Sequence, residues 1–352
     1  MPSAADDVRR AIDAAGGAIR FDQFVSIALY GEHGFYTRGG GRAGRRGDFL
    51  TSPEVGPLFG AVIAQALDAW WEELGRPDPF TVVDAGAGPG TLARTVLAAQ
   101  PRCACALSYR AVELSATQRA LHPPTVISSE TLPEQRFTGV IIANELLDNI
   151  PFRLFVHDGG WREAYVAHPE TRFVEQLVTP AELPLCLPTT ATHGARVAVQ
   201  VGARAWVDNA LLLLERGHLV TFDYCTTTSA MAQRTWREWL RTYTNHARGT
   251  HYLSAIGEQD ITVEVAIDQL PPPTQTTTQA EFLRQNGIGE LVEEGRAAWR
   301  HSVANPDLAA MAMRSRVREA EALLDQNGLG AFSVLHWSTE LRFSQNSEST
   351  AL

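Results

Sequence analysis

Residues 80–90 constrain the fold more than any other part of the chain. An apolar run at 80–83 ends in Asp84, and glycines follow at Gly86, Gly88 and Gly90. Glycine lets the backbone turn tightly and approach a ligand closely. A helix that begins after such a turn presents unpaired N–H groups and the positive end of its dipole to that ligand. The segment therefore predicts a buried strand, a ligand-binding turn and the start of a helix.

From this segment onward, strand-like and helix-like runs alternate, which is typical of a parallel sheet covered by helices. The run at 140–143 is continuous and apolar, as expected of a strand that is buried on both faces. The pattern predicts an α/β fold. We expect strands at 80–84, 107–113, 125–129, 140–143, 218–224 and 332–337, and helices at 91–100 and 203–215.

The rest of the chain has weaker patterns. Apolar spacing predicts a helix from 52 to 74 that begins with a capping box of Thr51 and Glu54. A second capping box, Thr278 with Glu281, opens another helix. We also expect helices at 21–30 and 306–326, a β insertion at 152–175 with a turn at 158–160, and a strand at 260–267, while 225–257 allow no assignment.

A length of 352 residues corresponds to about two domains. We expect a core that is interrupted by insertions and preceded by a helical segment. The expected division is an N-terminal helical segment with a Gly/Arg-rich loop (1–76), a core (77–150, continued at 201–225 and 331–343), a β insertion (151–200), a substrate or cap region (226–330) and a flexible tail (344–352).

Composition excludes several classes of protein. Thirty basic and forty acidic residues give a net charge of −10, which disfavours a general nucleic-acid binder. No run of 18 apolar residues predicts a membrane helix, and the first ten residues lack a signal region, so we expect a cytoplasmic protein. All thirty basic residues are arginine, which we interpret as the mark of a GC-rich bacterial genome. The four cysteines have no metal-ligand spacing, so we expect no metal and no disulfide framework.

The glycine turn differs from the dinucleotide pattern G-x-G-x-x-G because its third glycine comes one residue early. With Asp84 two residues before Gly86, the turn suits a ligand that ends in a charged amino acid. S-adenosylmethionine is such a ligand: its carboxylate can meet backbone N–H groups and its ammonium can meet carboxylates. A redox dinucleotide or an ordinary strand-to-helix turn remains the alternative.

Two further acids follow neighbouring strands. Glu113 ends the second strand, 23 residues after Gly90, where Rossmann-type folds place the carboxylate that binds ribose hydroxyls. Glu130 follows the third strand, and we expect it near the adenine or, alternatively, in solvent. Together with the glycine turn, these positions favour binding of an adenosine-containing cofactor.

A polar segment, 144–151, follows the fourth strand directly. It contains Asn144, Glu145, Asp148 and Asn149. Ligands of open parallel sheets bind beyond the carboxyl ends of the strands. Glu145 and Asp148 can hold a guanidinium by charge-assisted hydrogen bonds. The alternative is that these side chains only cap the turn that follows.

These residues resemble motif I of class I S-adenosylmethionine-dependent methyltransferases, and more specifically the MidA-like methyltransferases. That group includes a mitochondrial complex I assembly factor that methylates arginine. The matching motifs run in order over about residues 20–340. They include Ala28-Leu29-Tyr30 with Gly34-Phe35-Tyr36, GDFxTSPE at 47–54, DAGAGPG at 84–90, VELS at 112–115, NELLDNIP at 144–151, Phe222-Asp223-Tyr224 and Asp260-Ile261-Thr262.

The resemblance implies a Rossmann-like class I methyltransferase sheet, mostly parallel with an antiparallel last strand. It adds an N-terminal helical segment and an inserted β/α substrate region. It places GDFxTSPE at the mouth of the active site, which adds Asp48 and Thr51 to the residues expected to bind S-adenosylmethionine. In this scheme Asn144, Glu145 and Asp148 face the acceptor as catalytic residues.

We therefore predict methyl transfer to a protein side chain, with an arginine nitrogen as the acceptor. One alternative is a small-molecule O- or N-methyltransferase, for which His246 or His251 would serve as a base. Another is a non-catalytic assembly or binding protein on a methyltransferase scaffold. The expected partner is a protein substrate or a small-molecule acceptor, with no nucleic acid and no membrane. A homodimer is kept as a hypothesis because the sequence does not decide the oligomeric state.

Overall fold

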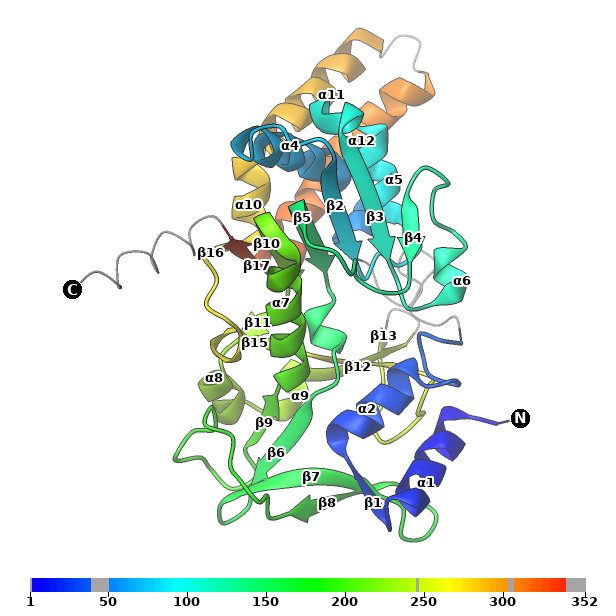
Figure 1. Cartoon of the computed structure of the whole chain (residues 1–352), viewed down its shortest axis with the longest axis vertical. Coiled ribbons are helices and arrows are strands. Elements are labelled where there is room, and N and C mark those ends of the chain that lie inside the picture. The colour runs from blue at the N-terminus through cyan, green and yellow to red at the C-terminus, as the bar shows by residue number, and fades with distance from the viewer. Residues whose placement is uncertain (1, 39–50, 245–246, 303–306, 340–352) are drawn as a thin grey trace, which may run out of the picture.

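A seven-stranded sheet forms the centre of the molecule (Figure 1). The computed structural model describes residues 2–38, 51–244, 247–302 and 307–339. The strand order is β16-β17-β10-β5-β2-β3-β4. The strands are β2 (Phe80–Ala85), β3 (Leu107–Val112), β4 (Ile127–Ser129), β5 (Phe137–Asn144), β10 (Leu214–Asp223), β16 (Gln275–Thr278) and β17 (Ser333–Ser338).

The five strands from β4 to β10 are parallel to their neighbours, whereas β17 is antiparallel to both β10 and β16. The predicted fold class, a mostly parallel sheet with an antiparallel last strand, is thus confirmed. After β2 the chain builds β3 and β4 on one side and then returns to place β5 on the other. The order therefore reverses between β2 and β5, which is where open α/β sheets bind ligands.

Both faces of the sheet are covered by helices, which explains the continuous apolar runs of its central strands. All six residues of β2 are buried. Side chains alternate between faces along a strand, so Val82 packs into one apolar core and Val83 into the other. One face is covered by α4 (Pro57–Glu73), α5 (Thr91–Ala98), α10 (Gln279–Gln285), α11 (Ile288–Ser302) and α12 (Leu308–Leu324), and the other by α7 (Val201–Leu213).

A second lobe lies below the central sheet in Figure 1 and has its own apolar core. Its main sheet has the order β1-β7-β6-β9, with β8 paired to β7, and a smaller sheet joins β13, β12 and β14. The second lobe comprises α1 (Ala4–Ala14), β1 (Ala18–Arg20), α2 (Phe21–Tyr30), β6 (Arg153–His157), β7 (Trp161–Ala167), β8 (Val174–Val178), β9 (Arg196–Val199), α8 (Thr228–Gln233), α9 (Trp236–Trp239), β12 (Leu240–Thr244), β13 (Ala247–Arg248) and β14 (Asp260–Val263).

The expected helix from 52 to 74 is interrupted. A short helix, α3 (Ser52–Val55), ends at Gly56 before α4 begins. The predicted capping box is wrong, since Thr51 makes no side-chain hydrogen bond to the first turn. Instead, the Leu58 N–H donates to Glu319 of α12 at 2.9 Å. A Cβ on Gly56 would lie 2.3 Å from that carboxyl carbon, so a larger residue here would force the Glu319 side chain to move. The second capping box, Thr278 with Glu281, is confirmed.

The chain also divides differently from our expectation. We placed residues 226–330 in one cap region, but 228–263 belong to the second lobe and 275–324 pack on the central sheet. Likewise, the segment 1–76 splits between α1 and α2 of the second lobe and α4 of the core. The expected strand 260–267 is two strands, because β15 (Val265–Ala266) leaves β14 to pair with β11 (Cys225–Thr226). The expected tail 344–352 lies outside the described residues.

Candidate functional site

A cavity of about 1150 Å³ opens at the carboxyl ends of β2, β3 and β5, between the central sheet and the second lobe. It is larger than the roughly 300–1,000 Å³ typical of a pocket for one small ligand, so it has room for a cofactor and an acceptor group. Six carboxylates and no arginine or histidine are found among the described residues that line it. The six are Glu54, Asp84, Glu113, Glu130, Glu134 and Glu145.

The glycine turn forms one wall of this cavity. Gly86, Gly88 and Gly90 all have positive φ, of 72°, 52° and 78°, which side chains other than glycine rarely adopt. A Cβ on Gly88 would meet only the Gln118 side chain, at 3.4 Å, and would otherwise extend into the open space. The turn is therefore a cradle that a larger side chain would fill. The α5 helix that follows begins at Thr91.

Glu113 is held in place by the backbone around it. Its carboxylate accepts the Gly88 N–H at 3.0 Å and the Ser115 N–H at 2.8 Å. The Gly88 carbonyl, in turn, lies 2.9 Å from Nε2 of His122. Each carboxylate oxygen keeps a further lone pair, so Glu113 can still accept two ribose hydroxyls. The glycine turn thus holds in place the Glu113 carboxylate, which we expect to bind the ribose.

Asp84 and Glu130 differ sharply in environment. Asp84 is buried, and its carboxyl accepts the Tyr109 hydroxyl at 3.1 Å. Burial, and to a smaller extent the charge of Glu113, raise the pKa of Asp84 to about 7. A nearby ammonium would favour its charged form. Glu130 lies at the rim and is exposed, with an ion pair to Arg119 at 3.1 Å.

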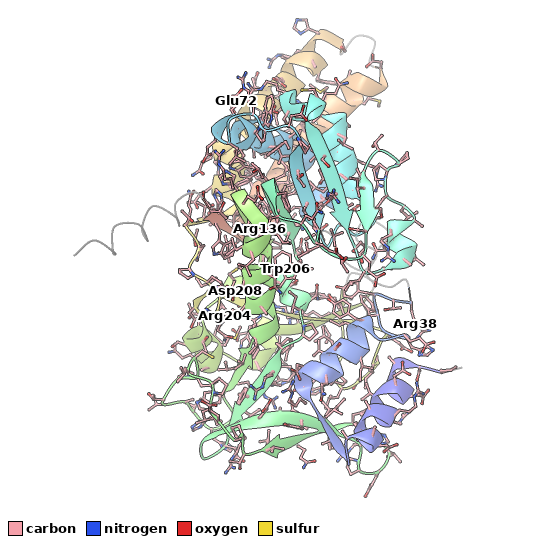
Figure 2. All side chains as sticks on the ribbon, viewed as in Figure 1. Arg38, Glu72, Arg136, Arg204, Trp206 and Asp208 are labelled. Atoms are coloured by element: carbon pink, nitrogen blue, oxygen red, sulfur yellow. The ribbon has the colours of Figure 1, made fainter. Side chains whose placement is uncertain are left out.

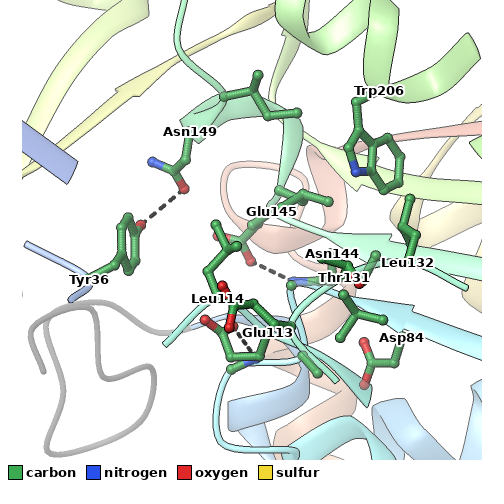
Figure 3. A pocket seen from close by; sticks show the side chains of 18 of the residues that line it. Tyr36, Asp84, Glu113, Leu114, Thr131, Leu132, Asn144, Glu145, Asn149 and Trp206 are labelled. Carbon is green, nitrogen blue, oxygen red and sulfur yellow. Dashed lines mark hydrogen bonds between the residues drawn. The ribbon is translucent and has the colours of Figure 1, made fainter. Parts of the chain in front are cut away.

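Asn144 and Glu145 lie where β5 ends (Figure 3). Glu145 has a φ of 52°, an unusual conformation for a residue other than glycine, and its N–H donates to the Phe222 carbonyl at 2.8 Å. Its carboxyl accepts the Asn144 amide at 3.1 Å and the backbone N–H of Ser52. Burial, followed by the charge of Asp148, raises the pKa of Glu145 to about 8. Strained backbone of this kind is common at functional sites.

Asp148 does not line the cavity, contrary to the role we expected for it. It is buried behind Glu145 and accepts the Thr262 hydroxyl at 2.5 Å. Asp223 and Asp260 are buried with it, and burial is the main cause that raises the pKa of all three acids. Asp148 can therefore act on an acceptor only through its neighbours and their shared negative charge.

The two residues expected from GDFxTSPE have different outcomes. Thr51 is buried and lines the cavity, beside Pro53 and Glu54. The neighbouring Ser52 donates its hydroxyl to Gln279 of α10 at 2.8 Å. Asp48 lies outside the described residues. Of the two histidines considered as bases, His246 also lies outside them, and His251 lies in the second lobe and does not line the cavity.

Sequence reasoning missed three aromatic residues of the cavity. Tyr30 ends α2, Tyr36 follows it in a loop, and Trp206 lies on α7. In one view Tyr36 and Trp206 flank the cavity with Glu145 between them (Figure 3), and Trp206 lies on the stretch of α7 between Arg204 and Asp208 (Figure 2). The two tyrosines belong to motifs we had noted without a role, whereas Trp206 had no signal beyond its place in the predicted helix at 203–215.

The donor set fits S-adenosylmethionine. Asp84 would hold the ammonium, Glu113 the ribose, and the glycine cradle the methionine end, and the cavity leaves space for them. Asn144 adds a buried Oδ1 with no hydrogen-bond partner among the described residues, as expected of a group that awaits a ligand. Among the described residues, no group of acids, cysteines and histidines has the arrangement of a metal site. No described helix is long and apolar enough to cross a membrane.

Comparison with known proteins agrees with this geometry. Two Burkholderia thailandensis structures of the COG1565 superfamily cover 95% of this chain and 91% of theirs. One, bound to S-adenosyl-homocysteine, is 27% identical with a TM-score of 0.81, and the other, a native form, is 26% identical with a TM-score of 0.78.

Curated relatives match a smaller part of the chain. The Drosophila melanogaster protein arginine methyltransferase NDUFAF7 homolog, mitochondrial, is 31% identical over 35% of this chain, and the Mus musculus NDUFAF7 is 28% identical over 40%. This chain spans only 35% and 41% of the length of those two proteins.

The family described as "Putative S-adenosyl-L-methionine-dependent methyltransferase" matches residues 62–285, which is more than half of the chain and includes the glycine turn, Glu113 and Glu145. The fold, the cradle and this match lead to one assignment: the chain belongs to the family of S-adenosyl-L-methionine-dependent methyltransferases.

Proposed function

We propose that this protein transfers the methyl group of S-adenosylmethionine to a nitrogen of an arginine side chain in a protein. The observation that carries the proposal is the buried group of acids at the inner end of the cavity. Glu145 lines the cavity, and Asp148, Asp223 and Asp260 lie behind it, with no arginine or histidine among the described lining residues. Buried carboxylates are stable when a cation pairs with them. A guanidinium is such a cation.

The chemistry divides simply between cofactor and protein. S-adenosylmethionine supplies a methyl group on a positively charged sulfur, which leaves with the bonding electrons. The protein aligns the acceptor nitrogen in line with that bond, and such positioning is worth about 7–11 kcal/mol of barrier. Glu145 would accept N–H bonds from the guanidinium and fix its plane. The nitrogen loses one proton after transfer, and Glu145, which lines the cavity and would be ionised beside the bound cation, would receive it.

Two further observations support a polypeptide acceptor. The cavity is large and acid-lined, and apolar side chains at its mouth are exposed: Leu114 is 57% exposed and Leu212 is 69% exposed. The curated relatives named above are protein arginine methyltransferases. A second candidate, a small-molecule N-methyltransferase, is favoured by the apolar wall that Trp206, Leu213 and Leu132 contribute.

One labelling experiment separates these candidates. The purified protein is incubated with methyl-tritiated S-adenosylmethionine and a host lysate, and polypeptides are separated from small molecules. We expect label in protein, released by acid hydrolysis as methylarginine. Label confined to the small-molecule fraction would favour the second candidate, and label in another amino acid would reject arginine as the acceptor. The Glu145→Gln variant serves as the low-turnover control.

A further inference from the structure

Two tyrosines from the N-terminal segment stand at the acceptor end of the cavity. The rings of Tyr30 and Tyr36 are stacked, with centroids 5.5 Å apart and planes 13° from parallel. Both residues line the cavity, although neither belongs to the central sheet that carries the cofactor residues. Stacking holds the two rings in one nearly parallel orientation. The second lobe therefore contributes a wall of defined shape to the site.

The pair is fixed by its hydroxyl groups. Tyr30 donates to the backbone carbonyl of Asn149 at 3.1 Å. The Tyr36 hydroxyl lies 3.1 Å from both Asn149 Oδ1 and Asp260 Oδ1, and Asn149 Nδ2 donates to the same Asp260 oxygen at 3.0 Å. Asn149 follows Glu145 in one short loop, so this network ties the rings to the loop that carries the acid. The hydroxyls are committed to protein partners, so a ligand in this cavity would meet the rings rather than free hydroxyl groups.

Electrostatics then define which ligand suits those rings. Burial, followed by the charge of Asp260, raises the pKa of both tyrosines well above the usual range, so the rings are neutral phenols and not bases. Glu145 lines the same cavity, and Asp148 and Asp260 lie close behind the rings. The face of an aromatic ring attracts a cation, and the attraction strengthens where water is excluded. The ring faces and the carboxylates therefore both attract a positively charged ligand.

We propose that Tyr30 and Tyr36 form the aromatic wall of an acceptor subsite that takes a planar cation, a guanidinium, flat against a ring while Glu145 accepts its N–H groups. The inference rests on the proposed arginine methylation and adds the residues that select for it. Guanidinium is planar and weakly hydrated and stacks on aromatic faces, whereas the ammonium of lysine is compact and strongly hydrated. The wall thus selects arginine over lysine, and Asn149 and Asp260 are positioning residues that hold it.

The test measures acceptor binding apart from turnover. The protein is saturated with S-adenosyl-homocysteine and titrated by calorimetry with Nα-acetyl-arginine N-methylamide, and separately with its lysine analogue. We expect Tyr36→Leu to weaken arginine-probe binding by about 5- to 30-fold and to lower the preference for arginine over lysine. Tyr36→Phe keeps the ring but removes the hydroxyl that holds it, so we expect a smaller loss of probe binding than in Tyr36→Leu and a retained preference for arginine over lysine. Affinity for S-adenosyl-homocysteine should stay within about threefold in both variants.

The wild-type protein gives an independent reading that does not depend on the folding of a variant. Protons on the δ-methylene of the bound arginine probe should shift upfield in NMR spectra, because they would lie over a ring. The inference is overturned if that shift is absent, if the wild type does not bind the arginine probe, or if Tyr36→Leu binds both probes as the wild type does. It is also overturned if arginine, lysine and S-adenosyl-homocysteine binding fall together. Methylarginine in the labelling experiment would stand in each of these cases, so the two proposals fail separately.

Discussion

Glu145 concentrates the chemistry of the site in a single side chain. Its positive φ and the bond from its N–H to Phe222 aim the carboxyl at the cavity from the end of β5. Burial, followed by the charge of Asp148, disfavours its negative charge and raises its pKa to about 8. A cation that enters the site would restore that charge. Under the proposed function, Glu145 would therefore contribute to acceptor binding and alignment rather than to cofactor binding.

Replacing Glu145 with glutamine tests whether this residue acts on the acceptor and not on the cofactor. The variant keeps the shape of the side chain and removes its charge, so we expect turnover in the labelled lysate to fall about 100-fold. Affinity for S-adenosyl-homocysteine, measured by calorimetry, should change by less than about threefold. Glu134→Gln is the matched control, because Glu134 lines the same cavity but is exposed. An equal loss of turnover and cofactor affinity would place Glu145 in the cofactor site instead.

The Gly88→Val variant tests in the same way whether the glycine turn binds the cofactor. We expect Gly88→Val to abolish measurable calorimetric binding of S-adenosyl-homocysteine, because the new side chain would fill the cradle and disturb the hold on Glu113. Valine also disfavours the φ of 52° at this position. Gly159→Val controls for such strain, since Gly159 has a φ of 65° in a hairpin turn of the second lobe. Unchanged affinity in a Gly88→Val variant with wild-type circular dichroism would contradict the assignment.

At the scale of elements, the pairing of β10 with β17 contains an acid-sensitive contact. Nδ1 of His218 lies 2.9 Å from Nε2 of His336, and the His218 ring stacks on Trp70 of α4. Burial, followed by the charge of His336, lowers the pKa of His218 to about 3. In the unfolded chain a histidine titrates near 6.5. The folded state therefore binds fewer protons than the unfolded state between these values, and stability falls as the pH drops below about 6.5.

Because of the lowered pKa of His218, we expect the free energy of unfolding to fall by about 2 kcal/mol between pH 7.5 and pH 5. The buried acids titrate in the opposite sense, since a raised carboxyl pKa favours the folded state at low pH. A comparison of variants cancels that contribution. His218→Gln should therefore lose less unfolding free energy in urea than the wild type over this pH range, by about 2 kcal/mol. His193→Gln, at an exposed position, should follow the wild type, and parallel pH profiles for all three proteins would refute the contact's role.

Elements whose signal is local could be predicted from the sequence. β2 and the glycine turn have a short apolar run and three spaced glycines, and α2 matches its predicted bounds of 21–30. β1 has only three residues and exists because it pairs with β7, about 150 positions later in the chain. α11 was not among the predicted helices; within it, Gly295 allows a close crossing, where a Cβ would lie 2.4 Å from the Met313 carbonyl of α12. The sequence therefore indicated elements with a local pattern, but it did not indicate elements that depend on contacts with distant parts of the chain.

The same distinction explains which site residues were found. Asp84, Glu113, Asn144 and Glu145 lie at or beside the ends of predicted strands, and parallel strands bring such ends to one edge of a sheet. Tyr30 and Tyr36 come from a different lobe. Nothing in their local sequence shows that α2 packs against the polar segment 144–151. Asp148 was assigned to the acceptor because the polar segment 144–151 directly follows a predicted strand and resembles the family motif. Its bond to Thr262 of β14 turns it inward.

At the scale of the whole molecule, the site joins two cores that can be perturbed separately. The residues expected to bind the cofactor lie at strand ends of the central sheet, while the tyrosines of the proposed aromatic wall come from the second lobe. Phe21 holds that lobe together: its ring lies 5.6 Å from Phe24, 5.5 Å from Phe152 and 5.2 Å from Tyr252. These contacts join three distant stretches of the chain. Because Phe21 begins the helix that ends in Tyr30, loosening it should disturb the acceptor end alone.

Phe21→Ala should cost about 3–5 kcal/mol of stability. Hydrogen exchange should become faster in α2, β6 and β14 but not in β2 or β3, and turnover should fall while affinity for S-adenosyl-homocysteine stays within about threefold. Leu323→Ala, in the core against the central sheet, is the matched control with a comparable cost but no effect on exchange in the second lobe. Faster exchange throughout the molecule in the Phe21→Ala variant would show that the two cores form one cooperative unit. In that case the acceptor wall would not be separable from the cofactor site, because every loss in the second lobe would reach the glycine cradle.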